Sequence, residues 1–224
     1  MMRSPCVRIA SGLALFRGVG ERRVASAARE ARLLRLGAGE TLVRRGARLP
    51  GLCAVASGSL KRSVGARPRA ERVLGLVAAG ESFGEAAALL GAPSPFDAVA
   101  MTEAEVLAIP LEALALLRLD RRFAQNLVDR LAGEVLQLLA GIEAGMLQRA
   151  PQRLASYLCS LAGTGDTDGW RVRLPVSKTV VAALVGVKKE TLSRLLRDLS
   201  ERRLIAVSRR DITILDREQL AGLR

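Results

Sequence analysis

The sequence predicts an α+β protein with three parts: an N-terminal β-roll of the cupin-like jelly-roll type, a long central helix and a C-terminal winged helix-turn-helix. Three patterns predict this fold. Short apolar runs separated by glycines fill the first half, a long proline-free stretch follows, and two short helical patterns with a hairpin pattern end the chain. The expected segments are residues 1–118 for the roll with an N-terminal helix, 119–149 for the central helix and 150–224 for the winged domain.

The N-terminal region has a helical composition from Glu21 to Leu36, where neither proline nor glycine interrupts the chain, so we expect one helix there. The earlier apolar stretch from Ile9 to Phe16 is similar to the centre of a signal peptide. However, Gly12 breaks it, Arg17 follows, and no cleavage site of small residues comes next. No stretch approaches the roughly 18 uncharged apolar residues of a membrane span. The expected location is the cytoplasm, with no membrane partner.

Between Leu36 and Ile109 the chain has the pattern of a compact antiparallel roll. Apolar runs of strand length alternate with glycines, which allow tight turns. The glycines that mark the runs are Gly39, Gly46, Gly51, Gly58, Gly65, Gly75, Gly80, Gly84 and Gly91.

The stretch from Leu111 to Gln148 contains no proline and is helical in composition. Its apolar residues recur every three or four positions, a period near 3.5 that is typical of a helix paired with another helix. The alternative is a helix whose apolar stripe packs on its own domain. We expect a dimer seam formed by Leu127, Leu131, Val135, Leu138 and Ile142. Pro151 ends this helix or begins the next one, which places a domain boundary near residue 150.

The C-terminal region begins with two short helices that meet at a turn. The first is expected from Ser177 to Val185, with the Ser177 hydroxyl capping its first turn and Gly186 ending it. The second is expected from Lys188 or Lys189 to about Arg202. Leucines at positions i, i+3, i+4 and i+7 give it one buried face. They are Leu192, Leu195, Leu196 and Leu199.

Two strands are expected after these helices, over Leu204–Val207 and Ile212–Leu215. They flank the polar stretch Ser208–Asp211, so together they predict a hairpin, which is the wing of a winged helix-turn-helix. The order helix, turn, helix, hairpin is typical of a domain that places its second helix in the major groove of DNA.

The outward face of the second helix suits base recognition. Arginine can donate two hydrogen bonds to guanine, glutamate can accept one from cytosine, and a serine hydroxyl can bond several base edges. We therefore expect Glu190, Ser193 and Arg194 to contact bases. The surrounding basic and hydroxyl side chains are expected to contact phosphates. These are Ser177, Lys178, Lys188, Lys189, Thr191, Arg197, Arg209 and Arg210. The alternative is a merely solvated charged face, which the turn glycine and the wing disfavour.

The formal charge of +13 indicates a polyanionic partner. Its distribution is uneven along the chain. Residues 1–50 carry 11 basic and 3 acidic side chains, residues 51–170 carry 11 and 13, and residues 171–224 carry 13 and 6. The basic excess at the C-terminal end coincides with the expected winged domain.

The composition disfavours enzymatic and metal chemistry. The chain has no histidine, which is the commonest general base and metal ligand. Its three cysteines, Cys6, Cys53 and Cys159, lie too far apart in sequence for the usual zinc or iron-sulfur spacing. Cys53 is the one candidate for a haem ligand, but a buried, inert thiol is the preferred interpretation. We therefore expect no catalytic residue, no metal and no cofactor.

The stretch from Leu174 to Leu215 resembles the DNA-binding domain of the cyclic-AMP receptor/FNR (Crp/Fnr) family, most specifically in ETLSR, Glu190 to Arg194. Gly39-Glu40, Ala56 to Ser59 and Ala79 to Glu85 resemble the family's cyclic-nucleotide-binding-like sensor roll, in the expected order. The resemblance covers nearly the whole chain. It implies a homodimeric transcription regulator whose long helix pairs with its partner and transmits effector binding to two DNA-binding heads. The glutamate, serine and arginine of ETLSR resemble the base-contacting residues of the FNR branch.

The chain departs from the family's pattern where the effector should bind. The resemblance implies an effector pocket that includes Phe83, Gly84, Glu85, Leu138 and Leu139. No lysine or arginine occurs from Ala86 to Leu117 to neutralise a cyclic phosphate, and a buried phosphodiester without a countercharge is costly. The iron-sulfur cysteines of oxygen-sensing relatives are absent too. We expect a pocket that is apolar and takes an uncharged ligand, or that is no longer used.

A basic side chain from elsewhere, such as Arg44, Arg45 or Arg72, would make an anionic ligand plausible again. The expected partners are double-stranded DNA, a second copy of the chain, RNA polymerase and an unknown small-molecule effector. Two recognition helices about 34 Å apart would select an inverted repeat. The alternative is a basic packaging protein that binds nucleic acid without reading its sequence.

Overall fold

The computed structural model describes residues 4–65, 71–162 and 170–223. The chain forms two compact units, residues 1–137 and 138–224. The division falls inside the long helix α5 (Arg121–Leu147), which therefore contributes to both units. The three segments expected from the sequence remain a prediction.

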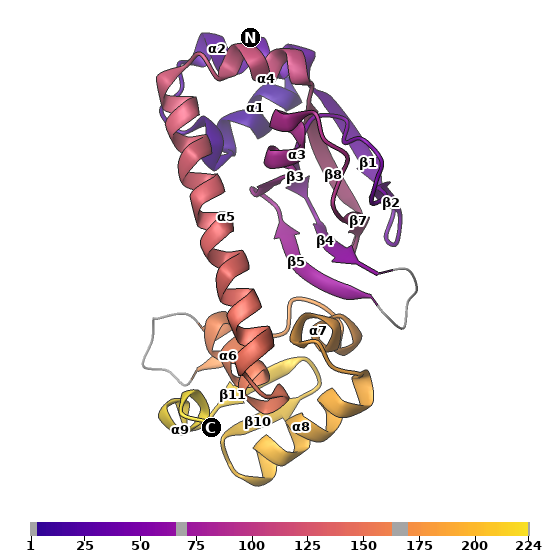
Figure 1. The fold of residues 1–224 in the computed structure, drawn as a ribbon, viewed down its shortest axis with the longest axis vertical. Coiled ribbons are helices and arrows are strands. Elements are labelled where there is room, and N and C mark those ends of the chain that lie inside the picture. Colours follow the sequence, from indigo (N-terminus) through magenta and orange to yellow (C-terminus); the bar gives the residue numbers. More distant parts are fainter. Residues whose placement is uncertain (1–3, 66–70, 163–169, 224) are drawn as a thin grey trace. The chain divides into compact units, whose positions relative to one another are not determined.

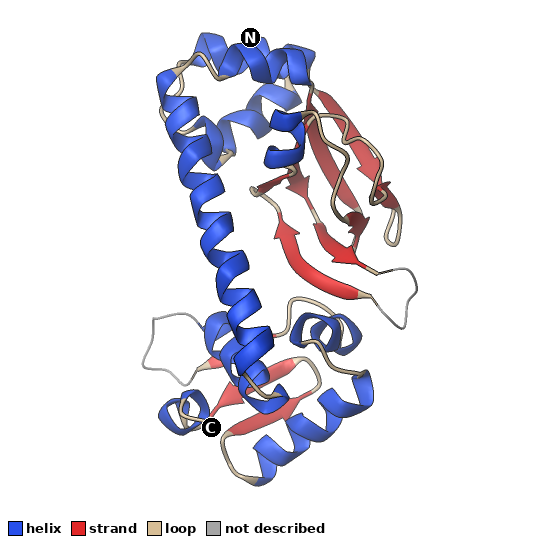
Figure 2. Ribbon diagram, viewed as in Figure 1, coloured by secondary structure: helices blue, strands red, loops and turns tan. Residues whose placement is uncertain are grey.

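The first unit contains the antiparallel roll, built from two four-stranded sheets (Figures 1 and 2). The sheets have the orders β1-β8-β3-β6 and β2-β7-β4-β5. Side chains from both sheets meet in one apolar cluster that includes Leu60, Phe83, Phe96 and Val106. The strands are β1 (Arg32–Leu36), β2 (Thr41–Val43), β3 (Leu52–Ser57), β4 (Ser59–Val64), β5 (Arg72–Ala78), β6 (Ser82–Phe83), β7 (Asp97–Ala100) and β8 (Ala104–Ile109).

The turn between β3 and β4 requires glycine. Gly58 has a φ of +75°, in the left-handed region that side chains disfavour. A Cβ atom there would collide with the carbonyl oxygen of Glu103 and would lie 2.9 Å from the Cα of Ala104. At this position the glycine pattern in the sequence therefore has a direct steric cause.

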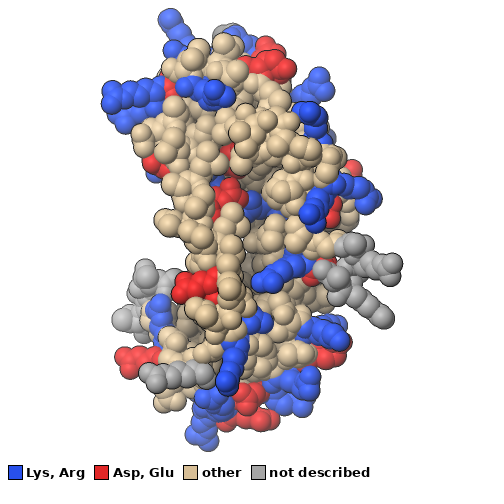
Figure 3. All heavy atoms as spheres, in the orientation of Figure 1, with Lys and Arg blue, Asp and Glu red and all other residues tan. Residues whose placement is uncertain are grey.

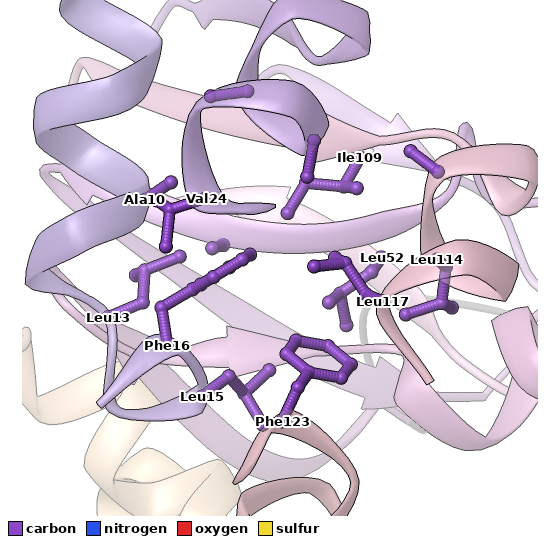
Figure 4. Packing of buried hydrophobic residues seen from close by; sticks show 14 of the residues in the cluster. Ala10, Leu13, Leu15, Phe16, Val24, Leu52, Ile109, Leu114, Leu117 and Phe123 are labelled. Atoms are coloured by element: carbon purple, nitrogen blue, oxygen red, sulfur yellow. The ribbon is translucent and has the colours of Figure 1, made fainter. Parts of the chain in front are cut away.

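Helices cover the other face of β3 and β8 and enclose a second apolar cluster (Figure 4). Leu52 and Ile109 point into this cluster from the sheet, while the rings of Phe16 and Phe123 lie 5.3 Å apart between centroids. Asn126 of α5 also donates hydrogen bonds to the carbonyl oxygens of Leu15 and Arg17, so the start of α5 is attached to the N-terminal region. The short helices of this unit are α1 (Pro5–Gly12), η1 (Ala14–Phe16), α2 (Glu21–Glu30), α3 (Glu85–Leu90) and α4 (Leu111–Leu117).

The helix expected from Glu21 to Leu36 is wrong in its second half. Helix α2 ends at Glu30, and Arg32–Leu36 forms the edge strand β1, paired antiparallel with β8 from Arg32↔Ala108 to Leu36↔Ala104. The leucines of this segment suit a helix or a strand equally well, and pairing with β8 decides between them.

The single helix expected from Leu111 to Gln148 is divided into α4 and α5. Asp120 begins α5, because its Oδ1 accepts hydrogen bonds from the backbone N–H groups of Arg122 (2.9 Å) and Phe123 (3.1 Å). Its Oδ2 lies 3.2 Å from Nε of Arg23 on α2. The cap and the ion pair together fix the direction in which α5 leaves the roll.

The apolar side chains of α5 are buried near its N-terminal end and exposed further along the helix. Leu127 is only 5% exposed and belongs to the second cluster, and Leu131 packs against the same cluster. Leu127 is therefore wrong as a seam residue, and the alternative of packing on the chain's own unit holds for this end of α5. Further along, Val135, Leu138 and Ile142 are 54%, 49% and 58% exposed.

The second unit combines helices with a three-stranded antiparallel sheet of order β10-β11-β9. Its elements after α5 are α6 (Ala150–Ala162), β9 (Arg171–Arg173), α7 (Lys178–Val185), α8 (Lys189–Glu201), β10 (Ile205–Ser208), β11 (Asp211–Ile214) and α9 (Arg217–Ala221). The expected helix-turn-helix and wing are present, with ends shifted by a residue or two. Among the described residues, no helix has the length and apolarity needed to cross a membrane.

Candidate nucleic-acid interface and sensor cavity

Helices α7 and α8 meet at Gly186, which ends α7 in the left-handed conformation with a φ of +74°. Leu192, Leu196 and Leu199 of α8 are buried, while Leu195 is partly buried. The buried leucines fix which face of α8 points outward. Figure 3 shows basic side chains gathered over α8 on the visible face.

The three expected base-reading residues share that outward face. Glu190, Ser193 and Arg194 are all exposed. The Ser193 hydroxyl donates to the carbonyl oxygen of Lys189, 3.1 Å away, so its oxygen remains open to accept a hydrogen bond. Glu190 lies in the first turn of α8, where the exposed amide groups favour a negative side chain.

Most of the expected phosphate contacts lie at the starts of the two helices and at the wing, while Arg197 lies further along α8. Ser177 precedes α7 but makes no capping hydrogen bond, so the expected cap is wrong and its hydroxyl is exposed. Arg209 and Arg210 form the two-residue turn between paired Ser208 and Asp211. The remaining candidates lie on α7, on α8 or, for Lys188, directly before α8. They are Lys178, Lys188, Lys189, Thr191 and Arg197, of which Lys178 and Thr191 are half-buried.

Arg210 has a structural partner in addition to its expected role. Its Nη2 donates to the carbonyl oxygen of Leu174, 2.9 Å away, and the backbone N–H of Leu174 donates to the carbonyl oxygen of Arg210 at the same distance. The wing turn is therefore attached to the end of β9. Strand β9 was not expected from the sequence, because three residues with two arginines have no strand pattern of their own.

Arg153 of α6 is a further residue that sequence reasoning missed. Its Nε donates to the carbonyl oxygen of Val185 at 2.8 Å, and its Nη1 donates to that of Gln148 at 2.6 Å. One partly buried guanidinium thus joins the end of α7 to the end of the central helix. Both acceptors are backbone carbonyl oxygens, which every residue has, so no sequence motif predicts this contact.

A cavity of about 540 Å³ lies between the roll and α5, within the first unit. Its lining is polar: Arg62 of β4 and Arg130 of α5 contribute guanidinium groups, and Arg17 adds a third. Glu81 and Asp129 contribute carboxylates. This cavity differs from the apolar pocket expected from the sequence, and its arginines are not Arg44, Arg45 or Arg72.

None of the five residues expected in the effector pocket lines this cavity. Phe83 and Glu85 are fully buried, and a Cβ on Gly84 would lie 2.5 Å from Cδ1 of Leu49. Leu138 and Leu139 are exposed and belong to the second unit.

Two of the cavity's three arginines, Arg62 and Arg130, are already paired within the chain. Nη1 of Arg62 lies 2.5 Å from Oε1 of Glu134 on α5, and its guanidinium lies 5.4 Å from the centre of the Phe96 ring. Nε of Arg130 lies 3.5 Å from Oε1 of buried Glu85, and its Nη2 donates to the carbonyl oxygen of Ser82. Two ion pairs of opposite direction therefore connect α5 to the roll.

Glu85 and Cys53 are both fully buried. The Ser82 hydroxyl donates to Glu85 Oε1 at 2.6 Å, while Glu85 Oε2 has no hydrogen-bond partner among the described residues. Burial, with a smaller contribution from the negative charge of Glu85, raises the pKa of Cys53 to about 12. This thiol therefore stays protonated at neutral pH. No group of three or more histidine, cysteine or carboxylate side chains suited to a metal occurs in the described residues.

Comparison with known proteins gives matches to both parts of the chain. A model of the Crp-like helix-turn-helix domain matches residues 152–223, and one of the cyclic nucleotide-binding domain matches residues 33–120. The global nitrogen regulator of Synechococcus elongatus is 30% identical over 140 residues. That alignment covers 60% of this chain and 63% of the relative, less than two thirds of the relative's length.

Two solved structures extend the likeness over most of the chain. A putative cAMP-binding regulatory protein from Silicibacter pomeroyi is 30% identical, with 96% of each chain covered and a TM-score of 0.57. FixK2 from Bradyrhizobium japonicum has a TM-score of 0.73 at 20% identity, over 86% of this chain and 96% of that one, which is a likeness of fold.

Proposed function

Since this chain belongs to the Crp/Fnr family of transcription regulators rather than to a family of enzymes, we propose that it acts as a homodimer that reads an inverted repeat in DNA. The observation that supports this most directly is the outward face of α8. There Glu190, Ser193 and Arg194 are exposed above a buried leucine face, next to the turn at Gly186.

Each of the three side chains offers a different hydrogen-bonding pattern to a base edge. Arg194 can donate two bonds to N7 and O6 of guanine, and Glu190 can accept from N4 of cytosine. Ser193 can accept, because its proton is engaged with Lys189. The basic groups at the starts of α7 and α8 and at the wing would hold phosphates and so set the register.

The proposed homodimer seam is the exposed part of α5. One side of this part of the helix is apolar and exposed, and it is formed by Val135, Leu138 and Ile142. An exposed apolar helix face of this kind is stabilised by a matching face, and a second copy supplies one through two-fold symmetry. Two symmetric heads then select two symmetric half-sites.

We infer that the effector, where one binds, is not a cyclic nucleotide. A buried phosphodiester needs an uncommitted positive charge, and Arg62 and Arg130 already neutralise Glu134 and Glu85. Arg17 adds one positive charge to the cavity, and Glu81 and Asp129 add two negative ones. The lining suits a polar ligand with little net charge better than an anion. The proposed output is regulation through RNA polymerase once the operator is occupied.

Selection of duplexes from a random library by the purified full-length chain tests the proposal. The expected result is enrichment of one inverted repeat, and the sequence of each half-site should contain guanine or cytosine positions that face α8. Binding of all sequences alike, with a steep dependence on salt, would instead establish the packaging alternative. The same selection with added cyclic nucleotide should give an unchanged motif and affinity.

A further inference from the structure

The cavity between the roll and α5 is lined by three segments of the first unit. The first is the N-terminal segment with Leu15 and Arg17, the second is the roll at Gly80–Ser82, and the third is α5. Asn126 attaches the first segment to the third, because its Nδ2 donates to the carbonyl oxygens of Leu15 at 3.0 Å and of Arg17 at 2.9 Å. The volume of about 540 Å³ is within the usual range of small-molecule sites.

Three charged side chains that line this cavity, Arg17, Glu81 and Asp129, form no ion pair with any described residue. Oε2 of Glu81 accepts a hydrogen bond of 2.8 Å from the backbone N–H of Ala78. Oδ1 of Asp129 accepts one of 2.9 Å from the side-chain amide of Gln125. Both donors are neutral, so the two negative charges remain uncompensated, as does the positive charge of Arg17.

The free charges of the cavity define the charge of a matching ligand. Arg62 and Arg130 are neutralised by Glu134 and Glu85, so neither pair adds a net charge. The three remaining side chains are one cation and two anions. A ligand that is electrostatically complementary to them carries one anionic and two cationic groups, whereas an anion meets a negative excess.

Arg17 and Asp129 line the cavity from the same side. Asp129 follows Asn126 by three positions on α5, so these two side chains are neighbours on the helix surface, and Asn126 binds the backbone of Arg17. The carboxylate and ammonium groups of an α-amino acid are likewise neighbours, since one carbon atom carries both. Arg17 and Asp129 also lie outside residues 33–120, which match the cyclic nucleotide-binding domain. Ligand preference at this place is therefore a property of this chain's own residues.

We propose that the cavity binds a basic α-amino acid. Arg17 contacts the α-carboxylate, Asp129 contacts the α-ammonium, and Glu81 contacts the cationic group at the end of the ligand's side chain. The inference rests on the effector site of the proposed function and names the class of ligand for it. A diamine lacks the group that Arg17 binds, and a neutral amino acid leaves Glu81 without a partner.

Calorimetric titration of the full-length chain with three matched probes tests the proposal. The probes are lysine, norleucine, which lacks the side-chain ammonium, and cadaverine, which lacks the carboxylate. Lysine should bind about three- to tenfold more tightly than either of the others, and salt should reduce this preference. No binding of lysine at millimolar concentration, or affinities for the three probes that agree within about twofold, would overturn the proposal.

Two variants assign the contacts. Arg17→Gln should bind lysine and cadaverine alike, and Glu81→Gln should bind lysine and norleucine alike. Arg29→Gln and Glu143→Gln, which remove the same charges from exposed positions outside the cavity, are the controls and should keep the parent's preference. Thermal unfolding verifies that each variant is folded. A preference that persists in both cavity variants would place the ligand elsewhere and overturn the proposal.

These titrations contain no DNA, so their outcome is separate from that of the duplex selection. A chain that selects no inverted repeat would contradict the proposed function. A chain that selects one, but does not prefer lysine, would contradict only the binding of a basic amino acid.

Discussion

The guanidinium of Arg153 donates a 2.8 Å hydrogen bond to the carbonyl oxygen of Val185, the last residue of α7. Its other hydrogen bond is to the carbonyl of Gln148, directly after α5. The helix-turn-helix is thereby attached to the end of the central helix by one side chain.

Replacing Arg153 should disturb DNA binding more than folding. Arg153→Ala leaves two backbone carbonyls without their donor and should lower the free energy of unfolding by about 1–3 kcal/mol. DNA affinity should fall further than the unfolded fraction explains, because α7 and α8 lose their fixed orientation. The measurements are urea unfolding and DNA titration at a temperature where the variant stays folded. Arg149→Ala, an exposed neighbour, is the control and should match the parent in both.

Arg194→Ala should reduce both affinity and discrimination. On the selected site it should cost about 1–3 kcal/mol of binding free energy, because a bidentate bond to guanine is lost. On a duplex with that base pair changed, parent and variant should bind alike. Titrations with matched and mismatched duplexes measure this, and equal losses on every sequence would show that Arg194 contacts only phosphate.

Ile142→Glu should separate the proposed dimer. It places a charge within the apolar seam and should raise the dimer dissociation constant by about 100-fold, equivalent to about 2.7 kcal/mol. Sedimentation at several concentrations measures the change. Leu90→Glu is the control, since Leu90 is 80% exposed on α3, and it should leave the association unchanged. A parent that sediments as a monomer at all concentrations would rule out the seam.

Glu134→Gln should destabilise the first unit. The substitution keeps the shape of the side chain but leaves the Arg62 guanidinium without its countercharge in a mostly buried position, at a cost of about 2–3 kcal/mol. Urea unfolding measures the loss, and Glu143→Gln, exposed on the same helix, should show none. Changing Arg62→Met as well should recover part of the stability, because no unpaired charge then remains. A stability equal to that of the parent would mean that the ion pair does not hold α5 to the roll.

Cys53 should resist alkylation at alkaline pH while the chain is folded. Its pKa is raised to about 12, so at pH 9 only about one thiol in a thousand is ionised, against about half for an ordinary thiol. Iodoacetamide followed by mass spectrometry should label Cys6 and Cys159 first, since neither is fully buried. Because the folded pKa is raised, the protonated thiol contributes stability below pH 9, and that contribution is lost between about pH 9 and pH 12.

The winged domain could be predicted closely because its signals are local. A leucine period of 3.6, a left-handed glycine at Gly186 and a two-residue hairpin turn each fix structure within a few residues. Strand β1 could not be predicted, because its partner β8 lies about 70 positions away. The same applies to β9, which exists only as an edge beside β11.

The cavity between the roll and α5 was the least predictable part for the same reason. From the sequence, a countercharge is absent from Ala86 to Leu117 and could otherwise come from Arg44, Arg45 or Arg72. The arginines that line the cavity are instead Arg62 on β4, Arg130 on α5 and Arg17. Arg62 and Glu134 are 72 positions apart, and no motif relates them. Charges that meet through tertiary packing leave no mark in a local pattern.

The N-terminal part of α5 is buried in the second apolar cluster through Leu127, whereas its apolar side chains Val135, Leu138 and Ile142 are exposed. In the proposed dimer, burial of the exposed side chains requires two chains to associate, so its rate is second-order in protein concentration. Folding of the N-terminal part of α5 involves one chain and is first-order. Occupancy of the operator should then rise more steeply than in proportion to the number of chains in the cell. Synthesis and degradation of the protein would themselves serve as a signal, acting alongside any ligand.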